Sequence, residues 1–397
     1  MLGSGISIPA GMPKLHEITE RVLSGKDIYY ATGEEIFTSY KPNLPITEEN
    51  VPRVLKFLYM LKVEIDYYYE KHRFKQDTSY CANYEDLYYA ASQIYYSELG
   101  EYDIPAVQPL VDKILPYTQP LLKRTNIRSE WILSQLAGET MKYIEYVVFH
   151  ELNKDPKPLD YLDFIKEACE DKGFSRVDIF TLNHDTVLEK YLERYLNQNE
   201  VLFSYGFFKP EGEQNGYWKP RLFNSRSFRV HLFKLHGSIN WFHTKDWSKI
   251  VIPSPSDMIK KDASARILAV DTRPILLIGT YNKMLEYTSG IFEELHYQFY
   301  RSLRQVKKLV ICGYGFGDRG INNKIIEWIY PSNNHRIILI DHEPETVRNK
   351  ARGSIRDKWN DWINEKKLII IAKKIEETSW KEIRDSLLKT QGYDIVL

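Results

Sequence analysis

The feature that most constrains the fold of this chain is a series of short apolar segments that each end at a polar residue or a glycine. The segments that end next to an asparagine, histidine, glycine or aspartate are residues 177–182, 230–235, 275–278, 309–312 and 337–340. Stretches with helical spacing of apolar residues lie between them. Uniformly apolar strands that alternate with helices are typical of a parallel sheet covered on both faces. The sequence therefore predicts an α/β fold with a doubly wound, mostly parallel sheet.

The 397 residues are enough for two to three domains. Residues 29–173 are rich in tyrosine and have helical periodicity, so we expect a large helical insertion between two parts of the α/β domain, 1–28 and 174–345. Residues 346–397 form an expected C-terminal extension of helix, strand and helix. The tyrosine-rich faces of the insertion suit either a protein interface or an internal core.

Composition excludes several classes of protein. The 54 basic and 54 acidic residues cancel, which disfavours a strongly basic nucleic-acid binder. The three cysteines, at positions 81, 169 and 312, contain no C-x-x-C pair, so a cysteine-rich zinc ribbon is excluded. The sequence shows neither a signal peptide nor an apolar run as long as a membrane span. We expect a cytoplasmic protein with reduced thiols and no membrane association.

A glycine-rich turn opens the chain. Gly3, Ser4 and Gly5, followed by Ser7, could cradle a phosphate with backbone N–H groups at the start of a helix, or could form an ordinary tight turn. Such a turn normally follows a strand, and almost no strand precedes this one. We therefore expect either residues upstream of Met1 in the native gene or a nucleotide site whose edge another segment completes.

Polar side chains follow the next two expected strands. Asn183, His184 and Asp185 come directly after 177–182, where they could serve function or cap the following helix. His236, which Gly237 follows, could act as a general base near neutral pH or could be a hydrogen-bonded structural histidine. His231 and His243 lie nearby in sequence, but the pattern does not favour a metal site.

Two later strand ends carry further candidates. The segment 313–318, Gly-Tyr-Gly-Phe-Gly-Asp, is a second glycine-rich turn, and two such turns on one sheet fit a dinucleotide better than one. Cys312 lies in an apolar strand and is interpreted as a small core residue. Asp341 could accept hydrogen bonds from a ribose diol, or could cap the helix that begins near Pro344.

In order and combination these motifs resemble those of the sirtuin family. Residues 3–7 and 11–13 resemble its opening Gly-Ala-Gly-x-Ser and Gly-Ile-Pro segments. Residues 181–185 resemble its Thr-Gln-Asn-x-Asp motif, and 235–238 resemble its catalytic His-Gly. Residues 313–315 are loosely similar to its late Gly-Thr-Ser turn.

The resemblance covers roughly residues 1–25 and 175–345 and implies a Rossmann-like fold that binds NAD. The catalytic residues it implies are Asn183, His236 and Asp185. The residues it implies for the nucleotide are Gly3, Ser4, Gly5 and Ser7 at the pyrophosphate, Gly313 and Gly315 with Phe316 toward the adenosine, and Asp341 at the adenine ribose.

The departures from the family decide which activity we expect. Deacylases of the family carry two cysteine pairs that bind zinc soon after the His-Gly, whereas no cysteine follows His236 here until Cys312. The motif variant at His184, the segment 313–318 and the helical insertion resemble the sirtuin-like effectors of bacterial anti-phage defence. That resemblance implies an NAD⁺ hydrolase that consumes NAD⁺ as substrate and needs no metal.

Two other functions remain open from the sequence, an NAD-dependent protein deacylase and a module that binds NAD or ADP-ribose without turnover. For partners, we expect a homo-oligomer that does not itself bind nucleic acid. The resemblance suggests a HerA-type DNA translocase as a further partner.

Overall fold

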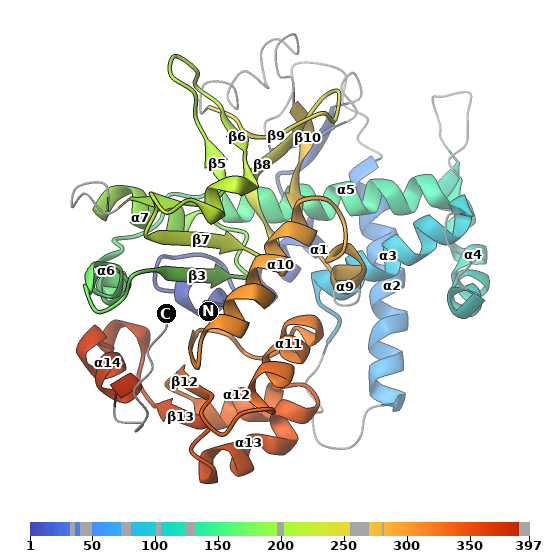
Figure 1. The fold of residues 1–397 in the computed structure, drawn as a ribbon. Coiled ribbons are helices and arrows are strands. Elements are labelled where there is room, and N and C mark those ends of the chain that lie inside the picture. Colours follow the sequence, from blue (N-terminus) through green and yellow to red (C-terminus); the bar gives the residue numbers. More distant parts are fainter. Residues whose placement is uncertain are drawn as a thin grey trace. The chain divides into compact units, whose positions relative to one another are not determined.

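The computed structural model describes residues 1–31, 36–39, 50–72, 81–100, 105–123, 132–196, 202–254, 270–279 and 282–388. The chain forms two compact units (Figure 1). The first contains residues 1–12, 153–277 and 283–397, and the second contains 13–152 and 278–282.

The second unit is mainly helical. Its helices are α1 (Leu15–Ser24), α2 (Asn50–His72), α3 (Tyr84–Leu99), α4 (Gln108–Leu122) and α5 (Leu133–Leu152), and its short hairpin is β1 (Tyr29–Ala31) with β2 (Ile36–Thr38). Tyr84 and Tyr143 are buried in its core, whereas Tyr59, Tyr67 and Tyr117 are exposed. The tyrosines of this unit therefore serve both its core and its surface.

The first unit is built on a parallel sheet. Its strands are β3 (Val177–Thr181), β4 (Phe203–Ser204), β7 (Val230–Lys234), β11 (Lys308–Cys312), β12 (Arg336–Ile340) and β13 (Leu368–Ile371). They pair as β4-β7-β3 and as β11-β12-β13, all parallel. Leu2 bridges Thr181 on one side and Cys312 on the other, so the two groups of strands form one sheet.

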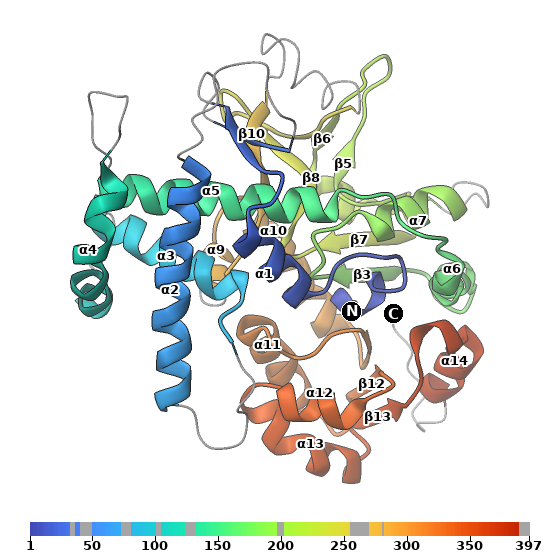
Figure 2. The same ribbon diagram turned by 180° about the vertical axis from the view of Figure 1, so that it is seen from behind.

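Helices cover both faces of this sheet. They are α6 (Asp163–Glu170), α7 (Val187–Tyr195), α9 (Asn282–Glu286), α10 (Gly290–Gln305), α11 (Arg319–Ile329), α12 (Pro344–Lys350), α13 (Ser354–Asn364) and α14 (Trp380–Leu388). Single turns of 3-10 helix lie at Ser4–Ser7, Pro105–Val107, Asp160–Leu162, Pro220–Asn224 and Ile375–Glu377. Figure 1 shows α10 on the near side of β3 and β7, and Figure 2 shows the same elements from behind.

The strands alternate their side chains between two hydrophobic clusters. Ile337 and Leu339 of β12 join the cluster formed with α10, α11 and α13. Ile338 and Ile340 join the cluster formed with α6, α7 and α14. Because successive side chains of a strand point to opposite faces, both faces are covered. The prediction of a doubly wound α/β fold is therefore confirmed.

A second sheet, which the sequence analysis did not anticipate, follows His236. It has the order β10-β8-β9-β6-β5, with β5 (Phe207–Phe208), β6 (Gly216–Trp218), β8 (Gly237–Thr244), β9 (Ile250–Ile252) and β10 (Val270–Leu276). Its described pairs are antiparallel. The prediction that 275–278 is a strand of the parallel sheet is wrong, because Ile275 and Leu276 end β10 here. An apolar run does not by itself distinguish the two kinds of strand.

Candidate functional site

The expected site segments follow strands that end at one edge of the parallel sheet. Thr181 pairs with Lys234, and Cys312 pairs with Ile340. The Leu2 N–H donates to the Phe180 carbonyl at 2.7 Å, so the glycine turn that follows begins at this same edge. The strand order reverses here, with β3 and β7 on one side of Leu2 and β11 and β12 on the other. Such a switch point is where open α/β sheets bind ligands.

The two glycine turns pack against each other through their backbones. A Cβ atom on Gly3 would lie 2.4 Å from the Gly313 carbonyl oxygen, and one on Gly313 would lie 2.7 Å from the Ile6 nitrogen. The Gly5 N–H donates to the Gly313 carbonyl at 3.0 Å. A Cβ on Gly315 would meet no atom within 4 Å. Close packing therefore explains why residues 3, 5 and 313 are glycines, while Gly315 faces open space.

Asn183 is held from the opening turn. Its Nδ2 donates to Ser7 Oγ at 2.9 Å, which joins two expected site residues that are 176 positions apart. The neighbouring Ser4 is exposed, whereas Ser7 is buried. Asn183 is 6% exposed, and its Oδ1 has no hydrogen-bond partner among the described residues. A buried amide oxygen without a partner is costly unless a ligand or water completes it.

Asp185 and His184 differ in what they contact. Asp185 Oδ1 accepts from the Val187 N–H at 3.0 Å, so this carboxylate does take part in the turn that starts α7. The His184 carbonyl accepts from the Ile239 N–H at 3.0 Å, which ties the segment to β8. Burial lowers the pKa of His184 well below its usual value, and positive charge on His236, Lys283 and Lys234 lowers it further. His184 is therefore neutral.

A buried ion pair lies behind this segment. Lys234 Nζ donates to Glu189 Oε1 at 2.7 Å and also to the Asp185 carbonyl, and the two side chains are 1% and 6% exposed. Ser238 Oγ lies 3.4 Å from Glu189 Oε1. The sequence analysis missed this pair. The available signal was a lysine at the end of an otherwise apolar strand, two residues before His236.

His236 lies in a cluster of polar side chains. Its Nε2 is 3.1 Å from the Tyr287 hydroxyl oxygen and 3.2 Å from Asp318 Oδ2. The Tyr287 hydroxyl donates to Asp318 Oδ2 at 2.6 Å, and Asp318 Oδ1 caps α11 by accepting from the Ile321 N–H at 2.9 Å. Tyr287 in turn stacks on His296 with ring centroids 3.7 Å apart.

Asp318 is ionised in this cluster. Burial by itself raises the pKa of Asp318, but the hydrogen bond and charge of His236 and the charge of Lys283 outweigh burial and lower it below its usual range. The sequence analysis gave neither Asp318 nor Tyr287 a role. Asp318 ends the second glycine-rich turn, which was a usable signal, whereas no sequence pattern marks Tyr287.

The remaining expected residues have mixed surroundings. Asp341 follows β12 at the same edge and accepts from the Glu343 N–H at 2.8 Å, with its side chain 18% exposed. Phe316 is 1% exposed and packs on Tyr314 and Trp359, with a backbone φ of +52°. The Phe316 side chain thus belongs to the core, and its backbone alone shapes the turn.

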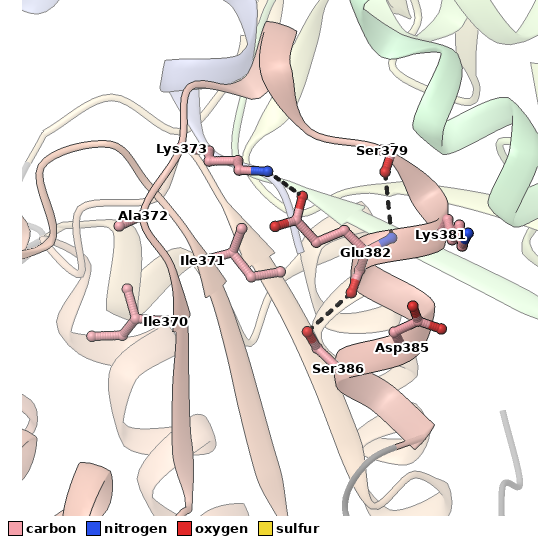
Figure 3. A pocket seen from close by; sticks show the side chains of 9 residues that line it. All are labelled: Ile370, Ile371, Ala372, Lys373, Ser379, Lys381, Glu382, Asp385 and Ser386. Carbon is pink, nitrogen blue, oxygen red and sulfur yellow. Dashed lines mark hydrogen bonds and ion pairs between the residues drawn. The ribbon is translucent and has the colours of Figure 1, made fainter.

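A cavity of about 440 Å³ lies elsewhere, between the end of β13 and α14 (Figure 3). Its polar groups pair with one another: Lys373 Nζ donates to Glu382 Oε2 at 2.8 Å, and Ser386 Oγ donates to the Glu382 carbonyl at 3.0 Å. The residues that line it include none of the expected site residues. The candidate site is therefore the group of residues around Asn183 and His236.

The described residues lack two other features. They contain no group of three or more histidine, cysteine, aspartate or glutamate side chains that could hold a metal ion. Within the same described ranges, no helix is both long and apolar enough to cross a membrane.

One family model matches part of the chain. Residues 177–370 match the family model described as a SIR2-like domain. The matched range runs from β3 to β13 and includes Asn183, His236 and Asp318, while the opening turn lies outside it. No curated protein matches the chain.

Proposed function

We propose that this chain, which contains a SIR2-like domain at residues 177–370, is an NAD⁺ hydrolase that releases nicotinamide and forms ADP-ribose. The domain indicates NAD-related activity. The observation that carries the finer proposal is that two groups follow neighbouring strands at the switch point of the sheet: a buried amide oxygen on Asn183 without a partner, and a histidine held by a carboxylate. Such groups can place a water and accept its proton during attack on a glycosidic carbon.

The bond to be broken joins the nicotinamide nitrogen to the ribose carbon. The nicotinamide ring is cationic in NAD⁺, so it takes the bonding electron pair and leaves as a neutral molecule. The ribose carbon passes through an oxocarbenium-like state, as in glycoside hydrolysis. Water adds to this carbon and gives up one proton. The chain must therefore hold the ribose, place one water and accept one proton.

Asn183 is proposed to place the water or the ribose. Its amide is fixed in orientation because Nδ2 donates to Ser7 Oγ, which leaves Oδ1 as an acceptor. An acceptor that is fixed before substrate binds needs no reorganisation during the reaction. His236 is proposed as the base that takes the proton from water, and Asp185 supports the site by shaping the turn after Asn183.

The nucleotide is proposed to lie along the two glycine turns. Gly315 faces open space, which supports close approach of the adenosine part of the substrate to this turn. Gly3, Ser4, Gly5 and Ser7 are proposed at the pyrophosphate, where the packing of Gly3 and Gly5 on the second turn sets the shape of the loop. Asp341 is proposed to accept hydrogen bonds from the adenine ribose.

The wider role is also a proposal. On the resemblance to sirtuin-like effectors, we propose that the protein depletes NAD⁺ in anti-phage defence as a homo-oligomer with a HerA-type translocase. A deacylase is the alternative activity. It is disfavoured because the chain has three cysteines, too few for the two cysteine pairs of the deacylase zinc module.

Release of nicotinamide, measured by liquid chromatography, tests the proposal. We expect the full-length protein to release it from NAD⁺ without any peptide, and Asn183→Ala and His236→Ala to lose about 10²–10⁴-fold in turnover. His335→Ala is the matched control, because His335 bonds the Trp328 carbonyl at the opposite edge of the sheet. A His236→Ala protein with parental turnover, or release that depends on an acyl-lysine peptide, contradicts the proposal.

A further inference from the structure

Two described side chains, Tyr287 and Asp318, contact one nitrogen of His236 and also contact each other. Nε2 lies 3.1 Å from the Tyr287 oxygen and 3.2 Å from Asp318 Oδ2. The Tyr287 hydroxyl and Asp318 Oδ2 are themselves 2.6 Å apart. His236 is 3% exposed, so the cluster is shielded from bulk water.

The protons of this cluster can be placed by their partners. Asp318 is ionised and can only accept, so the Tyr287 hydroxyl donates its single proton to Oδ2. The Tyr287 oxygen then offers a lone pair to His236. Among the described residues, both side chains that contact Nε2 are therefore acceptors, and a proton on Nε2 gives them the donor that they face.

We propose that Asp318 and Tyr287 are positioning residues that hold His236 with its proton on Nε2, so that Nδ1 is the nitrogen that takes up the proton of the reacting water. This inference rests on the proposed function for the role of Nδ1, but the protonation pattern itself does not depend on any substrate. The second glycine-rich turn then has a role besides nucleotide binding, because Asp318 at its end contacts His236.

The charged and titratable groups that face His236 in the described chain come from four segments. They are Asp318 at the start of α11, Lys283 in α9 and Tyr287 just after it, His296 on α10, and His184 after β3. Burial lowers the pKa of His184 well below its usual value and that of His296 to about 3, so both are neutral. The Asp318 charge therefore favours protonated His236, and the Lys283 charge opposes it.

Asp318→Asn separates positioning from folding. Oδ1 of residue 318 accepts from the Ile321 N–H, and asparagine caps helices as well as aspartate does, so α11 should be retained. The atom that faces Nε2 then becomes an NH₂ group, which donates. His236 should respond by accepting at Nε2 and moving its proton to Nδ1, the wrong pattern for a base at Nδ1.

Tyr287→Phe is the companion variant. It removes the hydroxyl but leaves both Asp318 and the ring that stacks on His296. Since the carboxylate remains and loses a competing donor, His236 should keep its proton on Nε2 and its pKa should not fall. A changed His236 tautomer in Asp318→Asn together with an unchanged one in Tyr287→Phe is a pattern that general damage to the fold does not produce.

Imidazole ¹⁵N nuclear magnetic resonance of the full chain, titrated over pH, tests the inference directly. His236 is assigned by its absence in His236→Gln, and Asp171→Asn serves as the control, because Asp171 accepts from Trp380 and Arg384 away from this cluster. In Asp318→Asn we expect the proton on Nδ1, a lower His236 pKa because the neighbouring carboxylate charge is lost, and a turnover at neutral pH reduced about 10²–10⁴-fold.

The outcomes separate the two proposals. An unchanged His236 tautomer and pKa in Asp318→Asn would overturn the inference even where the protein releases nicotinamide. If Asp318→Asn changes the His236 tautomer but the wild-type protein releases no nicotinamide, the positioning inference stands and the proposed function is refuted.

Discussion

Removing the buried lysine behind the Asn183–Asp185 segment gives the sharpest test of how the site is held. In Lys234→Met the side chain keeps its approximate length and apolar stem but loses its charge. Glu189 then lies buried without the ammonium group that lies 2.7 Å from its Oε1. Breaking a buried pair from one side costs about 3–5 kcal/mol. For a unit of this size that lowers the thermal midpoint by about 6–20 °C.

The loss of stability in Lys234→Met should depend on pH in a definite direction. Burial raises the pKa of Glu189 even with Lys234 beside it, and loss of Lys234 removes an interaction that lowers that pKa. The folded variant therefore prefers the protonated carboxyl, and the cost appears as pH rises through its raised pKa. Below the unfolded pKa of glutamate, about 4.3, the group is protonated in both states. The gap in midpoint between wild type and Lys234→Met should thus narrow as pH falls from 8 toward 4.

Thermal unfolding followed by circular dichroism measures this gap. Lys358→Met is the matched control, since Lys358 pairs with Asp361 at 3.0 Å on the surface and should change stability by less than about 1 kcal/mol. The double variant Lys234→Met/Glu189→Leu removes both charges and should recover most of the midpoint. Turnover should stay reduced, because the Asp185 carbonyl still lacks its donor. A midpoint for Lys234→Met equal to that of Lys358→Met, or no recovery in the double variant, would refute the reasoning.

Three further predictions concern the turns and the histidines. Gly3→Ala should destabilise the first unit by about 1–3 kcal/mol in denaturant unfolding, because its Cβ would lie 2.4 Å from the Gly313 carbonyl oxygen. Tyr161→Phe, which loses a 2.5 Å hydrogen bond to the carbonyl of Ile6, should raise KM for NAD⁺. Added to Asn183→Ala, it should not lower the turnover of that variant further. Stability should fall as pH drops from about 6.5 toward 4, because burial lowers the pKa of His231 to about 4 and the unfolded chain takes up the proton first. In His231→Gln, the thermal midpoint should depend less on pH over this range.

Most of the parallel sheet could be predicted because each strand is an apolar run that ends at a marked residue. The expected strands 177–182, 230–235, 309–312 and 337–340 are present in the sheet with closely similar bounds, and β13 is the strand expected within 346–397. The segment 275–278 was assigned to the wrong sheet, since its apolar character is shared by parallel and antiparallel strands. The antiparallel sheet was missed because β8 mixes polar and aromatic residues and because β5 and β9 are only two and three residues long.

The site was only partly visible in the sequence. Asn183 and His236 stand directly after strands, where the topology itself places them at the ligand-binding edge. Asp318 and Tyr287 could not be paired with His236 from sequence, because they reach it from segments 82 and 51 positions away. The glycines were noted for a nucleotide, whereas the structure gives Gly3 and Gly313 a packing reason as well. Whether Asp341 meets a ribose stays a prediction.

The most direct test of the central claim is the amounts of nicotinamide and ADP-ribose that the full-length protein forms from NAD⁺, measured together in one reaction with and without an acyl-lysine peptide. The account predicts equal amounts of both products, no change on adding the peptide, and loss of both in His236→Ala but not in His335→Ala. Equal turnover in His236→Ala and wild type, or an O-acyl-ADP-ribose formed only with the peptide, would contradict it.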